Sequence, residues 1–266
     1  MIRKIIVVLT LLFIVSWTAI PIMADDKADL AKKSQNPIAN MISLPFQNNT
    51  TFGVGPAEGT VNTLNIQPVY PFSVGKVNII NRFILPVVWQ GELVPGQGSQ
   101  FGLGDLSYTA FLSPAKPAKW TWGAGPSFLI PTATDERLGT GKWSAGIGGV
   151  VLTIQGKWVI GVLAQNVWSF AGDADRDDVD FLLAQYFINY NLKKGWYLSS
   201  APIITADWTA ESGEKWTVPF GAGVGKIAHI GNLPVDMQAQ LFYNVVSPTF
   251  GGDWTLRLQF KMLFPK

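Results

Sequence analysis

The sequence predicts an all-β transmembrane antiparallel up-and-down β-barrel of about 12 strands with a short N-terminal helical arm. Three observations support this class. The chain begins with an export signal, no later apolar run approaches the ~20 residues of a transmembrane helix, and segments of about ten residues alternate between polar and apolar positions. In the last such segment Trp254, Leu256 and Leu258 alternate with Arg257 and Gln259. That order suits a strand with one polar and one apolar face.

The first residues predict secretion. Arg3 and Lys4 precede an apolar run at 5–15, and the small residue Ala24 stands before two aspartates, so we expect a signal peptide over 1–24. The alternative is an uncleaved inner-membrane anchor, but Pro21 interrupts the run and no basic stop-transfer cluster follows it. The remaining chain divides into an N-terminal arm at 25–40 and a barrel at 41–266.

Composition favours a membrane barrel and excludes several other classes. Charged residues make up 14% of the chain, against roughly 25% in ordinary globular domains, while 11 Trp and 16 Phe are present. Cysteine is absent, so thiolate metal sites and disulfides are excluded. The net charge of +2 gives no sign of a nucleic-acid partner. We therefore expect a bacterial outer-membrane protein, without a cofactor, that contacts lipid and small solutes and works as a monomer.

Turn signals divide the mature chain into about twelve strands of the length that a tilted transmembrane strand needs, ~9–11 residues. The expected strands are 42–51, 60–70, 77–87, 103–113, 120–131, 142–154, 158–170, 180–192, 197–209, 216–227, 235–246 and 254–265. The connectors between them alternate between short basic turns and longer or acidic loops, as periplasmic turns and extracellular loops do. An even strand number then places both ends of the barrel on the periplasmic side.

Within each strand, the more apolar parity is predicted to face lipid, because a cationic residue there costs ~2–4 kcal/mol at the bilayer midplane. The lipid-facing rows include Trp120 and Trp122 on one strand and Trp158 and Trp168 on another. Aromatic residues stand at many strand ends, as in the girdles at the two membrane interfaces.

The opposite rows face the lumen, so any selectivity must come from them. They are polar and mixed in charge, and opposed charges in a narrow pore set its size and charge preference. The residues predicted to line the lumen and set selectivity are Arg82, Asp105, Asp207, Asp236, Arg257 and Lys261. The alternative is an ion-pair network that only fills the barrel, since twelve strands lie between the filled eight-stranded and the open 16–18-stranded types. Inward glycines, among them Gly123, Gly148 and Gly225, leave room in the lumen or permit strand curvature.

Catalysis is not expected. The single histidine, His229, falls at a predicted periplasmic turn, away from any Ser or Asp cluster that it would serve as a base. The acidic run 173–180 has the alternate spacing of a calcium loop, but Asp178 replaces the glycine of that motif and Ala184 its final glutamate. A solvated extracellular loop explains this run better.

The arm before the first strand has helix-forming residues, with Asp26 as a cap and Pro37 as a stop. The sequence leaves two positions open for it: it rests in the periplasm, or it folds into the lumen as a plug.

Five segments carry a resemblance to a known family: Asn36-Pro37-Ile38-Ala39-Asn40, Ser43-Leu44-Pro45-Phe46-Gln47, residues 98–105, residues 131–135 and Leu256-Arg257-Leu258-Gln259. The chain resembles the phenol-degradation MetA-pathway family of outer-membrane transporters, some of which carry the label neuromedin U. The likeness covers the mature chain. It implies an outer-membrane channel or uptake protein for small molecules, including aromatic or hydrophobic compounds, and it assigns no substrate residues.

The predicted function is thus passive passage of small molecules through a polar lumen. One alternative is a closed structural or adhesive barrel that acts through its extracellular loops. Another is a hydrophobic-substrate carrier with a lateral opening, which needs a gap in the wall near a strand kink such as Pro86 or Pro202.

Overall fold

The computed structural model describes residues 24–265 except Pro117, and the side chains from Lys27 onward. The predicted signal peptide, residues 1–24, therefore lies outside the described residues apart from the backbone of Ala24. Within the described part, no helix is long and apolar enough to cross a membrane.

One helix, two short 3₁₀ turns and fifteen strand segments make up the described chain. The helix is α2 (Ala24–Ser34), and the 3₁₀ turns are η3 (Glu136–Leu138) and η4 (Lys193–Gly195). The strands are β1 (Ile42–Val54), β2 (Gly59–Ile66), β3 (Val69–Val74), β4 (Val77–Gln90), β5 (Gln100–Leu103), β6 (Leu106–Pro114), β7 (Trp120–Ile130), β8 (Lys142–Gln155), β9 (Trp158–Gly172), β10 (Asp180–Asn191), β11 (Trp196–Ser200), β12 (Ile203–Asp207), β13 (Trp216–Ile230), β14 (Leu233–Val246) and β15 (Trp254–Phe264).

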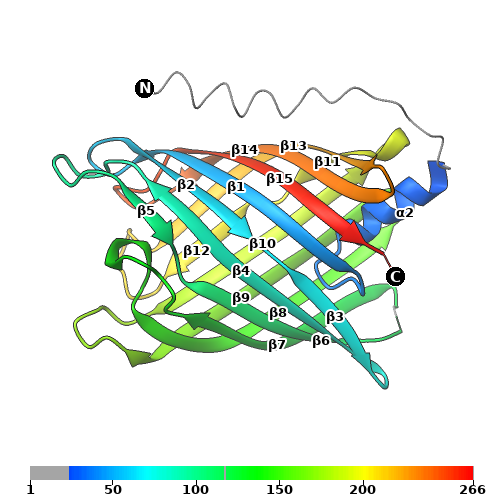
Figure 1. Ribbon diagram of the computed structural model, residues 1–266, viewed down its shortest axis with the longest axis horizontal. Coiled ribbons are helices and arrows are strands. Elements are labelled where there is room, and N and C mark those ends of the chain that lie inside the picture. Colours follow the sequence, from blue (N-terminus) through cyan, green and yellow to red (C-terminus); the bar gives the residue numbers. More distant parts are fainter. Residues whose placement is uncertain (1–23, 117, 266) are drawn as a thin grey trace.

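The sheet closes on itself, because β1 pairs antiparallel with β15 from Ile42 opposite Phe264 to Phe52 opposite Trp254. Three pairs of segments, β2 with β3, β5 with β6 and β11 with β12, are single strands interrupted by two residues each, so the barrel has twelve strands. The predicted fold is confirmed. Figure 1 shows the strands running obliquely round the barrel, with α2 at the end that carries the short turns and the long loops at the other end. The rule for outer-membrane barrels assigns the α2 end to the periplasm.

The three interruptions are differences from the predicted strands, and each has a local cause. Pro68 and Pro202 have no N–H to donate to a ladder, so pairing stops beside them. At Gly104 the ladder is replaced by other bonds: its N–H donates to the carbonyl of Pro86 over 2.9 Å, and its carbonyl accepts from Thr132 Oγ1 over 3.0 Å.

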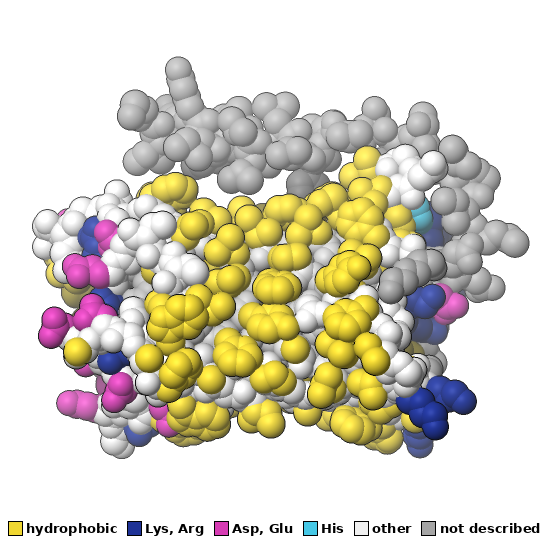
Figure 2. Space-filling model, turned by 60° about the horizontal axis from the view of Figure 1, so that its bottom comes forward, with side chains coloured by type: hydrophobic (Ala, Val, Ile, Leu, Met, Phe, Trp, Pro, Cys, Tyr) yellow, Lys and Arg dark blue, Asp and Glu magenta, His cyan; other side chains and the backbone are white. Residues whose placement is uncertain are grey.

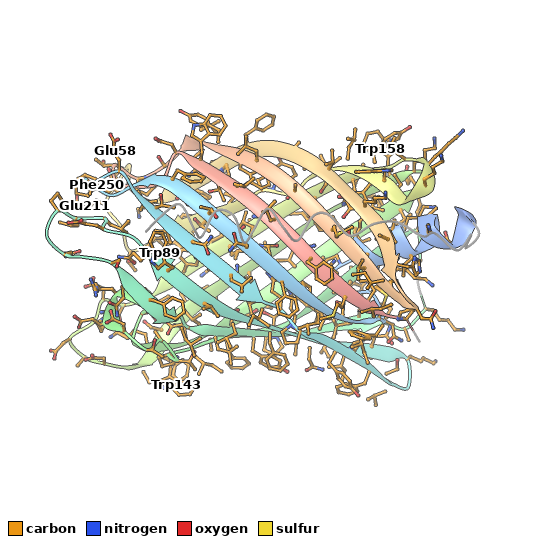
Figure 3. The ribbon with its side chains drawn as sticks, turned by 45° about the horizontal axis from the view of Figure 1, so that its top comes forward. Glu58, Trp89, Trp143, Trp158, Glu211 and Phe250 are labelled. Atoms are coloured by element: carbon orange, nitrogen blue, oxygen red, sulfur yellow. The ribbon has the colours of Figure 1, made fainter. Side chains whose placement is uncertain are left out.

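The outer surface carries the predicted apolar rows. On β7, Trp120 and Trp122 are each 53% exposed, whereas the intervening Thr121 is half-buried and Gly123 is buried. On the face that Figure 2 shows, an apolar band crosses the middle, with Asp and Glu side chains gathered at one end and a cluster of Lys and Arg at the other. In Figure 3, Trp89 and Trp143 lie toward the loop end and Trp158 at the opposite end. Aromatic girdles of this kind mark the two membrane interfaces.

The inward glycines serve both of the purposes that the sequence allowed. A Cβ on Gly125 or Gly223 would meet a carbonyl oxygen of the neighbouring strand at 1.8 or 1.9 Å, so these positions permit close, curved strand packing. Gly161 and Gly225 instead face aromatic rings: Phe187 is the cross-strand partner of Gly161, and Tyr197 is the partner of Gly225. The space that these two glycines leave is therefore filled by rings.

Replacing Gly225 with alanine should destabilise the barrel. The new Cβ would lie 2.1 Å from Cζ of Tyr197 and would force the ring away. We expect a loss of about 1–3 kcal/mol, the usual cost of overpacking. The measurement is urea unfolding in lipid vesicles, with Gly149→Ala as the control, because a Cβ at Gly149 meets no atom within 4 Å. Equal stability of the two variants would contradict this packing.

Candidate functional site in the barrel lumen

The last residue of α2, Ser34, and the segment that follows it lie in the periplasmic half of the lumen and are bonded to the inner wall. The hydroxyl of Ser34 donates to Asp236 Oδ2 on β14. The Nζ of Lys261, on β15, donates to the carbonyl of Ser34 over 2.8 Å. The side-chain amides of Gln35 and Asn191 form a reciprocal pair at 2.9 and 3.1 Å. Three strands, β10, β14 and β15, thus hold two successive residues of the arm.

Asp236 is the centre of this attachment. Its side chain is fully buried, at 0% exposure. Tyr197 donates its hydroxyl to Oδ1 over 2.5 Å, and Gln238 donates to the same Tyr197 oxygen over 2.6 Å. Lys261 is the cross-strand neighbour of Asp236, with Nζ 3.9 Å from Oδ2. A buried carboxylate is stable only when it is paired and hydrogen-bonded, and Ser34 of the arm supplies one of those bonds.

After these anchors the chain turns at Asn36–Ala39, and the apolar side chain of Ile38 packs against the wall. Asn36 Oδ1 accepts from the N–H of Ile38 over 2.9 Å, and the Asn36 carbonyl accepts from Ala39 over 3.2 Å. Ile38 is 3% exposed and belongs to a buried cluster contributed by one side of the wall. The other members of that cluster are Ile80, Phe111, Val150, Leu152, Val159, Leu163 and Phe187.

The lumen therefore has two unlike walls. The strands β4, β6, β8, β9 and β10 contribute the apolar cluster, whereas β1, β14 and β15 contribute amides and charges such as Gln47, Gln240 and Arg257. The sequence predicted the polar rows but not the apolar wall. The apolar wall could have been found from large apolar residues in inward rows that face inward glycines. Phe111 and Gly148 are an example, because a Cβ on Gly148 would lie 3.3 Å from the ring of Phe111.

Arg257 separates two cavities. A periplasmic cavity of about 140 Å³ surrounds the arm, an outer cavity of about 260 Å³ lies nearer the loops, and Arg257 lines both. Its Nε donates to Asn49 Oδ1 over 2.8 Å, and its Nη1 donates to the carbonyl of Ala201 over 2.7 Å. The guanidinium carbon lies 4.8 Å from the ring centre of Phe242. The guanidinium thus bridges β15, β1 and the β11–β12 break.

Of the six predicted lumen residues, four lie together in the lumen. Arg82 and Lys261 line the periplasmic cavity with Arg257, and Arg82 donates to Gln67 over 3.1 Å. Asp236 is buried beside them. Asp105 and Asp207 instead lie at the extracellular end. Asp105 accepts from the N–H groups of Ala133 and Thr140 at 3.1 and 2.6 Å, and Asp207 accepts from the N–H of Thr209 at 3.0 Å. Both of these carboxylates anchor loops.

The wall has a seam where β11 passes into β12. Trp196–Ser199 pair with β13, and so do Thr205 and Ala206, but residues 200–204 make no ladder pairs with residues 218–222 in the described chain. Pro202 and Pro219 stand on the two sides of this stretch. Ser200 Oγ bridges it by donating to the carbonyl of Gly221 over 2.7 Å. At Pro86, by contrast, the wall is continuous, since Pro86 pairs with Asn65.

No group of three or more His, Cys, Asp or Glu side chains arranged to hold a metal is found among the described residues. In the acidic loop, Asp173 accepts from the N–H of Asp175 over 3.0 Å, and Asp178 lies 3.5 Å from Nζ of Lys142. These contacts are those of a solvated loop. His229 lies at the periplasmic end of β13.

The comparisons with known proteins place the chain in a family. The family model described as "Putative MetA-pathway of phenol degradation" matches residues 43–260, so the chain belongs to this family. No curated protein sequence matches.

One solved structure supports the fold, and two others are more distantly similar. The COG4313 outer membrane channel from Pseudomonas putida F1 is 19% identical, with 84% of this chain and 94% of that chain covered and a TM-score of 0.64. The CymD monoaromatic hydrocarbon channel is 10% identical, covering 94% and 95%, with a TM-score of 0.48. The Salmonella typhi outer membrane phospholipase dimer is 13% identical, covering 92% and 99%, with a TM-score of 0.44. The likeness to the COG4313 channel shows the fold, and together with the apolar band of the outer surface it identifies a bacterial outer-membrane β-barrel.

Two extracellular loops should separate in acid. Thr249 donates its hydroxyl and its N–H to the carboxylate of Glu214 over 2.6 and 2.7 Å, and these bonds lower the pKa of Glu214 from its ordinary value of 4.5. A lowered folded-state pKa stabilises the contact above the ordinary pKa, and the contact is lost as the pH falls through the folded value. We expect the hydrogen-exchange protection of the Thr249 amide to fall in that range.

The control is Glu214→Gln, which should remove the pH dependence of that protection while leaving the amide of Leu241, within β14, unchanged. Protection of the Thr249 amide that stays constant in the wild-type protein as the pH falls would contradict this assignment.

Proposed function

We propose that this protein lets small molecules cross the outer membrane passively through its lumen, and that aromatic and other hydrophobic compounds are among them. One observation carries the proposal: the periplasmic half of the lumen is occupied by the arm, a terminal segment, and not by side chains of the wall alone. Displacing the arm opens that half without unfolding a strand. We also propose that one barrel suffices, that no cofactor takes part and that the role is not catalytic.

The charges in the lumen support a preference for anions among polar solutes. Arg82, Arg257 and Lys261 line the periplasmic cavity, whereas Asp236 is fully buried behind Ser34. Three cations face the space that a solute would cross, and a like-signed lining concentrates ions of the opposite charge. The apolar cluster that also faces the lumen, with Phe111 and Phe187, supports passage of apolar solutes. Membership of a family named for phenol degradation agrees with that solute class.

A second route is favoured by the seam. The outer cavity is lined by Ile203 and Pro219, which belong to the stretch where β12 and β13 are unpaired. We propose that apolar solutes leave the lumen sideways here, into the membrane, because parting these strands breaks no ladder hydrogen bonds between residues 200–204 and 218–222. The closed structural or adhesive barrel is the competing account, and absence of conductance would favour it.

Neutralising the lumenal cations should change ion selectivity. We expect Arg257→Gln and Arg82→Gln to reduce anion preference, because each removes a positive charge from the lining of the periplasmic cavity. The measurement is the reversal potential of the full-length mature protein in a planar bilayer under a KCl gradient. Lys116→Gln, in an exposed periplasmic turn, is the control and should leave the potential unchanged. Unchanged reversal potentials in both arginine variants would show that Arg82 and Arg257 do not set ion selectivity.

Joining the two sides of the seam should separate the two routes. Because the chain has no cysteine, Ile204→Cys with Val218→Cys can be linked selectively by a bis-maleimide. These residues stand opposite each other by the register of β12 with β13. We expect the link to slow the uptake of toluene by proteoliposomes and to leave ion conductance unchanged. The control is the same double variant with each cysteine capped by a monofunctional maleimide, so that no link forms. Equal toluene uptake in linked and unlinked protein would exclude the lateral route.

A further inference from the structure

We infer that the apolar cluster around Ile38 is a binding site for small apolar ring compounds, and that Ile38 occupies this site until such a compound displaces it. The inference rests on the proposed function only for the claim that the bound compound is a transported solute. The site itself is argued from the packing of the arm against the wall.

The site has walls of uniform chemistry. Ile80, Phe111, Leu152 and Leu163 are each at most 1% exposed, and Phe187 is 6% exposed. Five neighbouring parts of the barrel, β4, β6, β8, β9 and β10, contribute these side chains. Two aromatic rings and several branched aliphatic side chains form a surface that a ring hydrocarbon can contact without leaving a polar group unpaired.

Glycines make the hollow that Ile38 fills. A Cβ on Gly123 would lie 3.4 Å from Cδ1 of Ile38 and 3.2 Å from the carbonyl of Leu112, so the tip of Ile38 lies against bare backbone. On β9, a Cβ on Gly161 would lie 2.4 Å from Cζ of Phe187. The wall is thus recessed at Gly123, where the Ile38 side chain packs, and at Gly161, where the Phe187 ring packs.

Ile38 contacts a different part of the wall from the other buried residues of the arm. The polar anchors act at Ser34, which bonds to Asp236 on β14, and at Gln35, which bonds to Asn191 at the end of β10. The apolar residues on either side of the turn, Ala31 and Met41, belong to a second cluster with Ile227 and Leu263. Among the described residues of the arm, Ile38 is the one in the first cluster, whereas the neighbouring Ala39 packs against the second.

The chemistry of the occupant follows from what Ile38 contributes. Its side chain offers only apolar surface, so a replacement must match that surface and needs no hydrogen-bond partner. The space that Ile38 would vacate is lined by apolar side chains, and an apolar space stays dry and takes up small apolar molecules such as benzene, whereas polar solutes lose their hydration on entry. Benzene and toluene fit this description, and a hydrated ion does not.

The test uses benzene with the full-length mature protein in lipid nanodiscs, with isotope-labelled Ile and Leu methyl groups. Intermolecular nuclear Overhauser effects from benzene to the methyls of Ile80, Leu152 and Leu163 report this site and not the surrounding lipid. Wild-type protein, Ile38→Ala and Met41→Ala are compared over a benzene titration. Met41→Ala removes a buried apolar side chain of the second cluster, directly after the arm, but leaves Ile38 in place.

We expect the methyl contacts in all three proteins, and in Ile38→Ala at a benzene concentration about tenfold lower, because the wild-type site is free only in the fraction of molecules whose Ile38 is displaced. In the wild type, the Ile38 methyl signal should shift as benzene binds. Absence of the contacts in the wild type overturns the inference, even if Ile38→Ala shows them, because the truncation itself creates an apolar cavity. An equal gain in Met41→Ala also overturns it, because loosening of the arm would then explain binding. These results are independent of conductance, so a silent channel with the expected contacts would refute the proposed function alone.

Discussion

The buried carboxylate of Asp236 is the group on which the arrangement of the lumen depends. Tyr197 reaches it because Gly225 leaves room for the ring, Lys261 stands beside it on the next strand, and Ser34 brings the arm to it. A buried charge that loses one partner is costly, so each of these groups holds the others in place. The arm is thereby part of the same hydrogen-bonded unit as the wall. Its position in the lumen follows from the need to satisfy this carboxylate.

The two walls of the lumen explain how one barrel suits unlike solutes. Charges and amides line β1, β14 and β15, while β4, β6, β8, β9 and β10 contribute the apolar cluster, with Arg82 on β4 as a further charge. Arg257 crosses between the outer and the periplasmic cavities, and its bond to the Ala201 carbonyl connects it to the start of the seam. The selectivity of the pore and the integrity of its wall therefore share one side chain. A solute that displaces Arg257 from Ala201 would act on both at once.

Much of the fold could be predicted from alternation alone, because lipid on one side and a polar lumen on the other impose a period of two on every strand. The breaks at Pro68 and Pro202 were not predicted in place, since proline is tolerated within a strand wherever its missing N–H faces no partner. Charged inward residues such as Arg82 and Lys261 were found by the same parity. Asp105 shares that parity but lies in the break between β5 and β6, and its partners are amides of the loop at 131–141, which no periodicity reveals. The place of the arm depended on contacts between Ser34 and Asp236, which are far apart in the sequence.

The central claim is that the arm closes a lumen that is otherwise a pore. It is tested most directly by single-channel conductance in a planar bilayer, comparing the full-length mature protein with protein that lacks residues 25–40. The account predicts low or intermittent conductance with the arm and steady, larger conductance without it. Silence in both proteins, with the barrel folded by circular dichroism and heat-modifiable migration, would contradict the account and identify a closed barrel.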